Sequence, residues 1–252
     1  RNLMAKSSLS IAMISFSQAI RLVAQNISPV AQYINSKNFD ANTKFEEFTG
    51  ATRVAFFDWL YKITPSGATP NRFATARAGE LFVRPLTKDA KDPFWNGRDG
   101  AESADLACRQ NFHLLVTDGY WSDKGNPTIN GLVKATDPGV LPDGHAYQPE
   151  TPNTYAYSHQ QPIPNTDDNC DYFNDVDCSP TLAEIAYHYW ATDLQPGLEN
   201  KVPPYFPHMS PGKTTKDDEI YFHPDNDPAT WQHLVQYMVT LGVNGTLAYP
   251  DA

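Results

Sequence analysis

The sequence has few cysteines, no long apolar run and no excess of positive charge. Three of its 252 residues are cysteines, too few for a disulfide-rich scaffold. No apolar stretch reaches the ~20 residues that a membrane-spanning helix needs. Lysine and arginine number 19 against 29 aspartates and glutamates, giving a net charge of −10. We therefore expect no nucleic-acid partner, which would need a basic face, and no membrane span or basic membrane anchor.

Several catalytic patterns are also missing. No phosphate-binding loop and no G-x-G-x-x-G follows an expected strand, so nucleotide binding has no support. No G-x-S-x-G is present, and no carboxylates are paired at a spacing that suits general acid–base catalysis. We expect a protein that is not an enzyme, with a metal-dependent hydrolase as the rival interpretation.

The few cysteines that are present suggest one local cross-link. Cys170 and Cys178 bracket the acidic loop DNCDYFNDVDC, and we expect a disulfide between them, which implies an oxidising compartment. Zinc is a weaker alternative, because no further Cys or His lies at ligand spacing. The loop could also hold Ca²⁺, but it lacks the glycine of an EF-hand. Cys108 is left either as a buried free thiol or as the partner of a cysteine outside this chain.

The stretch Asn111 to Trp121, NFHLLVTDGYW, organises the rest of the chain. Its short apolar run predicts a strand buried in a sheet that is covered on both faces. The run ends in Thr117-Asp118-Gly119, which places a carboxylate at the C-terminal tip of a strand, where open α/β sheets bind ligands. An alternative is that Asp-Gly forms a tight turn that Asp118 caps.

The segments around this strand alternate between helical and extended patterns. The first segment is ambiguous: we expect a helix over about 1–17, while LSIAMISF (9–16) fits a strand equally well. Pro70 is a favourable first residue for a helix, so Thr69, which precedes it, is the expected N-cap of a helix over 70–82. The other expected elements are a strand at 19–26, helices at 49–63, 70–82 and 181–194 (the last capped by Ser179), a helical turn at 229–233 and a strand at 237–243.

Strands that alternate with helices predict an α/β fold, a mostly parallel sheet with helices on both faces. The polar segment 83–106 reads as a linker, and 122–179 reads as a long surface insertion, because it is rich in Pro, Asn, Asp and Tyr and has little periodicity. Residues 247–252 read as the start of a linker. His113, His159, His188 and His208 are scattered along the chain and are weak ligand candidates.

Five blocks of the sequence resemble the N-terminal von Willebrand factor A-like domain of the PilY/PilC family of type IV pilus tip proteins. The blocks follow the family order and span most of the chain after residue 45. They read FTGATRVAFFDWLYKI, SGATPNRFATARAGELF, CRQNFHLLVTDGYW, SPTLAEIAYHYWATDLQPGLENKVPPY and DPATWQHLVQYMVTLGVNGTL.

The resemblance implies a metal-ion-dependent adhesion site. Thr69 matches the threonine ligand and Asp118 the aspartate ligand of such a site, for a divalent cation such as Mg²⁺, Mn²⁺ or Ca²⁺. The D-x-S-x-S loop that supplies most ligands is absent here. Either the first strand and its loop lie upstream of Arg1, so that residues 1–252 lack the first strand of the domain, or the site of this homologue is incomplete.

The function that the resemblance implies is that of a secreted adhesin and assembly factor, exported through the periplasm to the cell surface at the pilus tip. Its expected partners are the minor and major pilins and a ligand on a host or abiotic surface. The rival within this class is a structural protein that primes or caps the pilus and has no ligand of its own.

Overall fold

The computed structural model of the 252-residue chain describes residues 10–16, 45, 50–62, 71–117, 126–134, 139–147, 180–223 and 225–240. Its elements are β1 (Ser10–Phe16), α1 (Gly50–Lys62), α2 (Asn71–Phe82), the 3₁₀ helix η2 (Gly100–Glu102), β2 (Asn111–Thr117), α3 (Leu182–Ala191), α4 (Asp218–Tyr221) and β3 (Leu234–Thr240). None of the helices in this part of the chain is long and apolar enough to cross a bilayer.

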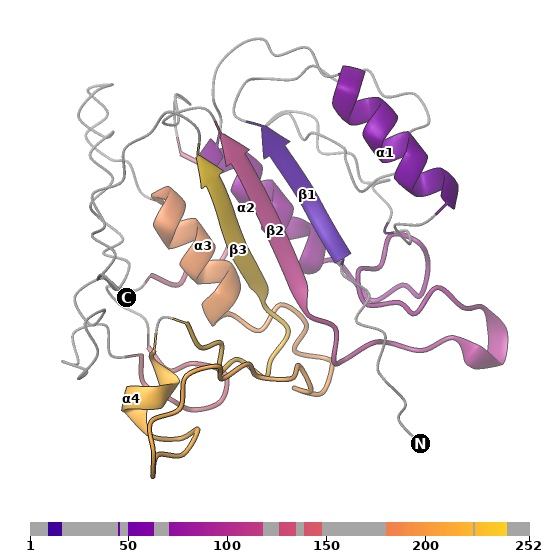
Figure 1. The fold of residues 1–252 in the computed structure, drawn as a ribbon. Coiled ribbons are helices and arrows are strands. Elements are labelled where there is room, and N and C mark those ends of the chain that lie inside the picture. The colour runs from indigo at the N-terminus through magenta and orange to yellow at the C-terminus, as the bar shows by residue number, and fades with distance from the viewer. Residues whose placement is uncertain are drawn as a thin grey trace.

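The three strands form a parallel sheet with β2 in the middle (Figure 1). β1 pairs with β2 from Ser10 opposite Asn111, with one irregularity between Ala12 and Ile14. β3 pairs with β2 in unbroken register from Leu234 opposite Asn111. The α/β class with a parallel sheet is therefore confirmed.

The expected N-terminal helix over about 1–17 is wrong. Residues Ser10–Phe16 are extended, because their backbone groups pair with β2, and the alternative of a strand at 9–16 is confirmed. The expected strand at 19–26 lies outside the described residues. The structure does not test whether a first strand lies upstream of Arg1.

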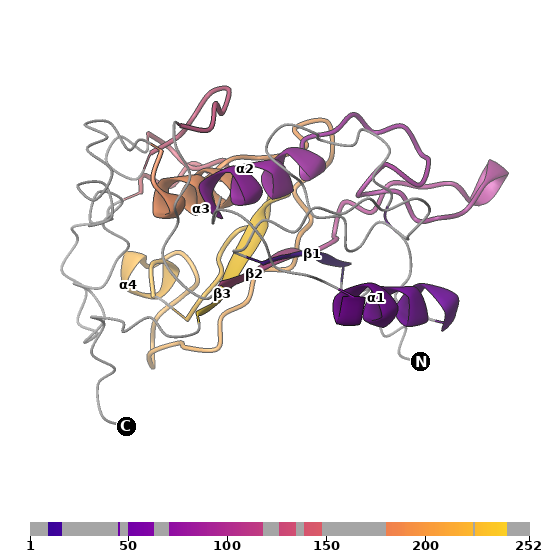
Figure 2. The same ribbon diagram turned by 90° about the horizontal axis from the view of Figure 1, so that it is seen from above.

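Helices α2 and α3 lie together on one face of the sheet, while α1 lies on the other side, beyond β1 (Figure 2). Burial along β2 alternates accordingly. Leu115 and its neighbours on the helix side are buried, whereas Phe112, Leu114 and Val116 on the other side are half-buried. The face of β2 toward α2 and α3 is therefore buried, as expected, and the opposite face is half-buried.

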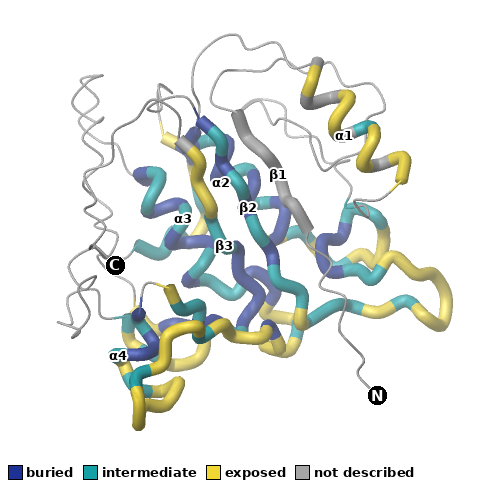
Figure 3. The backbone as a smooth tube through the Cα atoms, viewed as in Figure 1, coloured by how far each residue is buried: buried dark blue, intermediate teal, exposed yellow. Residues whose placement is uncertain are grey.

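The helix at 50–62 forms as expected, but three apolar side chains whose burial is described do not pack into a core. Val54, Phe57 and Tyr61 are exposed, and Figure 3 shows most of the described residues of α1 as exposed. The end of β3, with Tyr237, is exposed as well (Figure 3). Periodicity placed α1 correctly, but it did not decide what covers the helix.

The main core lies where α2 meets α3. Gly79 is the point of closest approach, because a β-carbon added there would overlap the ring of Tyr189. The Tyr189 hydroxyl donates to the backbone oxygen of Ala76 at 3.0 Å, which fixes the ring against α2. The core cluster around this contact consists of Ala76, Ala78, Leu81, Phe82, Phe94, Ile185, Tyr189, Leu194 and Leu234.

Helix α3 begins two residues later than its Ser-Pro signal suggested. The N-cap is Thr181, whose hydroxyl accepts from the Glu184 N–H at 3.1 Å, while the Glu184 carboxylate accepts from the Thr181 N–H at 2.8 Å. This capping box satisfies two backbone donors at once, so the expected cap at Ser179 is replaced by Thr181. Lys134 lies 3.5 Å from the buried Glu184 carboxylate and balances its charge.

The helical turn expected at 229–233 does not form. The backbone oxygen of Thr230 accepts from the N–H of Val202 at 2.9 Å, and that of Gln232 accepts from the N–H of Leu194 at 2.8 Å. These carbonyls bond across to another segment instead of to a helical turn, and β3 then starts at Leu234, three residues before the expected strand.

The described residues contain one cysteine, Cys108, and its thiol is free and exposed. The alternative of a buried thiol is therefore wrong, and pairing with a cysteine outside this chain stays open. Cys170 and Cys178 lie outside the described residues, so their disulfide stays a prediction.

The packing at Gly79 predicts an effect opposite in sign to helix propensity. In an exposed helix, Gly→Ala stabilises by about 1 kcal/mol. Gly79→Ala should instead lower the free energy of unfolding by about 1–3 kcal/mol, because the new methyl group overpacks against the ring of Tyr189. Urea unfolding of the two proteins measures the difference. Gly197→Ala is the control, since nothing lies within 4 Å of a β-carbon there, and stabilisation by Gly79→Ala would contradict the packing.

Candidate functional site

The C-terminal end of β2 meets the start of α2. Thr117, the last residue of β2, accepts a hydrogen bond at 3.2 Å from the side-chain amide of Asn71, the first residue of α2. Both residues are buried. The bond therefore fixes the start of this helix at the edge of the sheet where parallel strands end, the position at which α/β folds bind ligands.

The two predicted metal ligands flank this bond in sequence. Thr69 precedes Asn71 by two residues, and Asp118 directly follows Thr117. Both lie outside the described residues, so their role stays a prediction. A hard divalent cation prefers hydroxyl and carboxylate oxygens as ligands. Asn71 and Thr117, the described residues nearest in sequence to Thr69 and Asp118, are in contact with each other.

A buried arginine cross-links the same region. Arg72 is fully buried, and its Nη1 donates to the Asn126 side-chain oxygen at 2.8 Å and to the Pro180 backbone oxygen at 3.4 Å. A guanidinium stays charged and offers five donors, so these acceptors tie the start of α2 to the start of α3 and to the segment after β2. The sequence analysis missed Arg72, because an arginine in an amphipathic helix normally points to solvent.

Two of the weak histidine candidates are core residues. His113 on β2 is fully buried, and its Nδ1 lies 2.6 Å from the side-chain oxygen of Gln236 on β3. The backbone N–H of Val133 donates to His188 Nδ1 at 3.1 Å. Burial lowers the pKa of each imidazole to about 4, so both rings are neutral at pH 7. They act as packed hydrogen-bonding groups in the structure.

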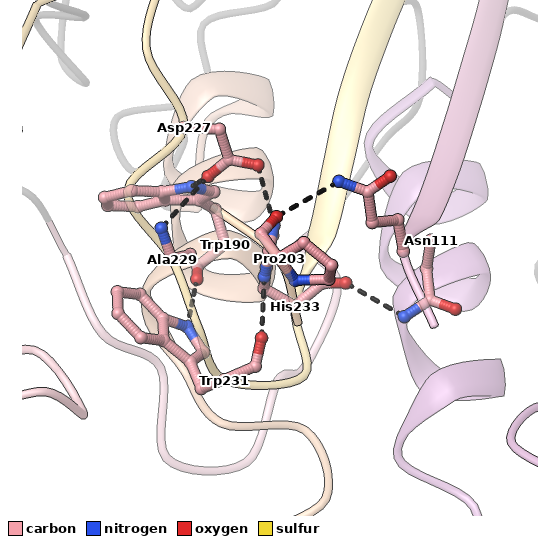
Figure 4. Close-up of polar contacts among 8 residues, drawn as sticks. Asn111, Trp190, Pro203, Asp227, Ala229, Trp231 and His233 are labelled. Atoms are coloured by element: carbon pink, nitrogen blue, oxygen red, sulfur yellow. Dashed lines mark hydrogen bonds and ion pairs between the residues drawn. The ribbon is translucent and has the colours of Figure 1, made fainter. Parts of the chain in front are cut away.

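A second polar network lies at the opposite end of the strands, just before β3 (Figure 4). The carboxylate of Asp227 is its centre. One oxygen accepts from the Trp190 indole N–H at 3.1 Å and from the Ala229 N–H at 3.3 Å. The other lies 3.0 Å from His233 Nε2, and His233 Nδ1 lies 2.8 Å from the Trp231 backbone oxygen.

Electrostatics stabilises the charged form of this carboxylate. Burial by itself raises the pKa of Asp227, but the hydrogen bond and charge of His233, with the bonds from Trp190 and Ala229, lower it below its usual value. Both ring nitrogens of His233 face acceptors, so a protonated ring donates to each of them. The result is a nearly buried contact between carboxylate and imidazole in which both carboxylate oxygens and both ring nitrogens have hydrogen-bond partners.

Side-chain amides extend the network to the starts of β2 and β3. Asn111 Nδ2 donates to the His233 backbone oxygen at 3.1 Å (Figure 4). Gln232 Nε2 donates to the backbone oxygens of Ala107 at 2.6 Å and Glu199 at 3.0 Å. These bonds fix where the two strands begin and pair, so we assign the network a structural role.

The chain is similar to three curated proteins, each described as type IV pilus biogenesis factor PilY1, from strains of Pseudomonas aeruginosa. The protein of strain PAK is 33% identical over 252 residues, covering 99% of this chain and 19% of the relative. That of strain PAO1 is 36% identical over 205 residues, 81% of this chain and 15% of the relative. That of strain UCBPP-PA14 is 29% identical over 252 residues, 100% of this chain and 18% of the relative.

The chain belongs to the PilY1 family. It spans less than a fifth of the length of the relatives it matches. No protein-family model matches the chain, and no solved structure matches it. The family is therefore established by the PilY1 relatives, and the von Willebrand A-like fold is not.

Two of the blocks on which the resemblance to this family rests build the Asp227 network. DPATWQH (227–233) supplies the carboxylate, Trp231 and His233, and TLAEIAYHYW (181–190) supplies Trp190. The sequence analysis missed the network, because it interpreted 229–233 as a helical turn. The close spacing of Asp, Trp and His in one short block was the available signal.

Removing the central carboxylate should be costly. Asp227→Ala leaves the Trp190 indole and His233 without their partner, and we expect a loss of about 3 kcal/mol in the free energy of unfolding, the low end for a buried pair because the Asp227 side chain keeps 23% exposure. Asp227→Asn should cost about 1 kcal/mol, because the amide can still accept from Trp190 and donate to a neutral His233. Urea unfolding at pH 7 measures both.

The pH dependence gives the control for this pair. The lowered pKa of Asp227 stabilises the protein above the unfolded value of ~3.9, and this stabilisation is lost as the pH falls through the folded pKa. Asp227→Asn should abolish that component. Asp99→Asn, at an exposed position whose side chain makes no capping bond, should leave the pH profile unchanged. Equal profiles for all three proteins would contradict the lowered pKa of Asp227.

The buried histidines predict a separate loss of stability at mildly acidic pH. Each has a folded pKa of about 4 against ~6.5 when unfolded, so the unfolded chain binds more protons between these values. We expect the free energy of unfolding to fall from pH 6.5 to pH 4 by about 1–3 kcal/mol per histidine. In His188→Gln the free energy of unfolding should fall less over this pH range, because only His113 still contributes. The same pH dependence in wild type and His188→Gln would contradict a neutral, buried His188.

Proposed function

We propose that this chain is a von Willebrand factor A-like domain of a type IV pilus biogenesis factor. In this proposal it acts at the pilus tip as an adhesive and assembly module. Support comes from the PilY1 relatives, whose matches cover 81% to 100% of the chain, and from the parallel sheet with α2 and α3 packed on it. Secretion through the periplasm and contact with minor and major pilins follow from this role and are part of the proposal.

The proposal further assigns Thr69 and Asp118 to a divalent cation. The observation that carries it is the hydrogen bond between Asn71 and Thr117, which brings the chain segments next to both predicted ligands to one edge of the sheet. Two ligands do not complete a coordination shell, and the D-x-S-x-S loop of adhesion sites would supply the others. A cation with an open position would accept a carboxylate from a ligand on a host or abiotic surface.

Attachment should therefore depend on the cation and on Asp118. In bacteria that carry the full-length protein, attachment of the wild type should fall when divalent cations are chelated and recover with Mg²⁺ or Mn²⁺. Asp118→Ala should raise the cation concentration for half-maximal attachment at least about tenfold, since the loss of a ligand costs at least as much as the loss of a second-shell partner. Pilus number should stay the same.

Asp89→Ala, at an exposed site, is the matched control and should behave as the wild type. Normal attachment by Asp118→Ala, with the protein present at the cell surface, would contradict the adhesion site. Loss of pili on deletion of the domain would instead favour the second candidate, a structural protein that primes or caps the pilus.

A further inference from the structure

A cluster of two imidazoles and one carboxylate lies beside α4, near the starts of the strands (Figure 1). His208, His223 and Asp225 each have a potential ligand atom within 4.8 Å of those of the other two, and within the described residues this is the one group of three such side chains. His208 Nε2 lies 3.0 Å from a carboxylate oxygen of Asp225. The two rings are stacked, with centroids 4.6 Å apart and planes inclined by 17°.

The backbone that carries the cluster is tightly cross-linked. The side chain of Asn226 accepts from the His208 N–H at 3.1 Å and donates to the backbone oxygens of His208 at 2.8 Å and Ile220 at 2.7 Å. Tyr205 and Asp227 exchange two backbone hydrogen bonds of 2.7 Å. Chain segments 15 residues apart are thus held together by bonds that do not involve the clustered side chains, so the cluster is built by the scaffold.

The environment of the rings suits metal coordination. Burial and the neighbouring His208 lower the pKa of His223, although Asp225 raises it, and a neutral imidazole is the form that binds metal. His223 is 4% exposed, and its Nδ1 already accepts the N–H of Asp225 at 3.1 Å, a bond that coordination through this atom would replace. The His208 side chain is 53% exposed, so it can turn toward a shared ion.

The donor set selects the class of metal. Imidazole nitrogens favour zinc and related transition metals, whereas Mg²⁺ and Ca²⁺ prefer oxygen ligands. Tetrahedral Zn²⁺ with bonds of 2.0–2.2 Å needs ligand atoms ~3.3 Å apart. The present separations, all within 4.8 Å, therefore need to close by at most about 1.5 Å, which a turn of the exposed ring can supply. Three protein ligands would leave the fourth position open to water or to a partner's side chain.

We propose that His208, His223 and Asp225 form a binding site for a divalent transition metal, with Zn²⁺ as the best match. The site would join the segment before α4 to the segment after it. It uses different chemistry from the predicted Thr69 and Asp118 site and lies at the opposite end of β2, because α4 is near the strand starts whereas Thr117 is at the strand end (Figure 1). His223, which was not among the histidine candidates of the sequence analysis, stacks on His208 in the folded chain.

The test is metal binding by the purified full-length protein, using Zn²⁺ in calorimetry and Co²⁺ as a spectroscopic probe with excess Mg²⁺ present. The wild type should bind one more equivalent of Zn²⁺ than either His208→Gln or Asp225→Asn. If the variants still bind that equivalent, their affinity should be at least about tenfold weaker than that of the wild type. Co²⁺ should give the visible absorption of a site with nitrogen ligands. Both substituted side chains are about half exposed, so the variants should fold, which circular dichroism verifies.

The matched control is His145→Gln. His145 also lies 3.1 Å from a carboxylate, that of Asp143, but no third ligand completes a group there within the described residues. This variant should bind Zn²⁺ as the wild type does. Equal stoichiometry and affinity in wild type, His208→Gln and Asp225→Asn would overturn the proposal, as would a loss in His145→Gln equal to that in His208→Gln.

Discussion

The close approach of α2 and α3 is the constraint on which the described core depends. Gly79 has no β-carbon, so the ring of Tyr189 can lie directly against the helix backbone, and its hydroxyl bonds to Ala76. Any side chain at position 79 would push the helices apart and open the layer that covers the sheet. Because interiors are packed as densely as organic crystals, a gap there would disturb the core cluster that includes Leu81, Ile185 and Leu234.

That packed layer positions polar groups at both ends of β2. At the C-terminal end, the Asn71 amide bonds to Thr117. At the N-terminal end, the Asn111 amide bonds to the backbone before β3, next to the contact between Asp227 and His233. Buried polar groups are tolerated when they are hydrogen-bonded, and here they fix the register of the strands where apolar side chains alone would specify it less sharply.

The two ends then differ in the chemistry that they offer. The predicted ligands at the C-terminal end are oxygens, suited to hard cations. The cluster near the strand starts offers two imidazoles, suited to transition metals. A pilus protein with both would respond to two classes of ion through two separate parts of one domain, and neither response would require the other.

The sequence by itself determined the helices at 50–62 and 71–82, the strand at 111–117, the parallel α/β class and the family. These depend on local periodicity and on ordered motifs, which the chain carries in one dimension. Even so, the period-two pattern of β2 did not reveal that its buried face holds Asn111, His113 and Thr117, because their hydrogen-bond partners come from distant segments.

Tertiary structure alone decided the rest. Residues 10–16 are a strand because β2 offers them a partner, although the same residues could form a helix. Residues 229–233 do not form a helical turn, because the N–H groups of Leu194 and Val202 bond to the carbonyls of Gln232 and Thr230. His208 and His223 are 15 residues apart, and they meet only because Asn226 fixes the loop that carries them. Such contacts between distant residues have no local signature, so only the folded chain could reveal them.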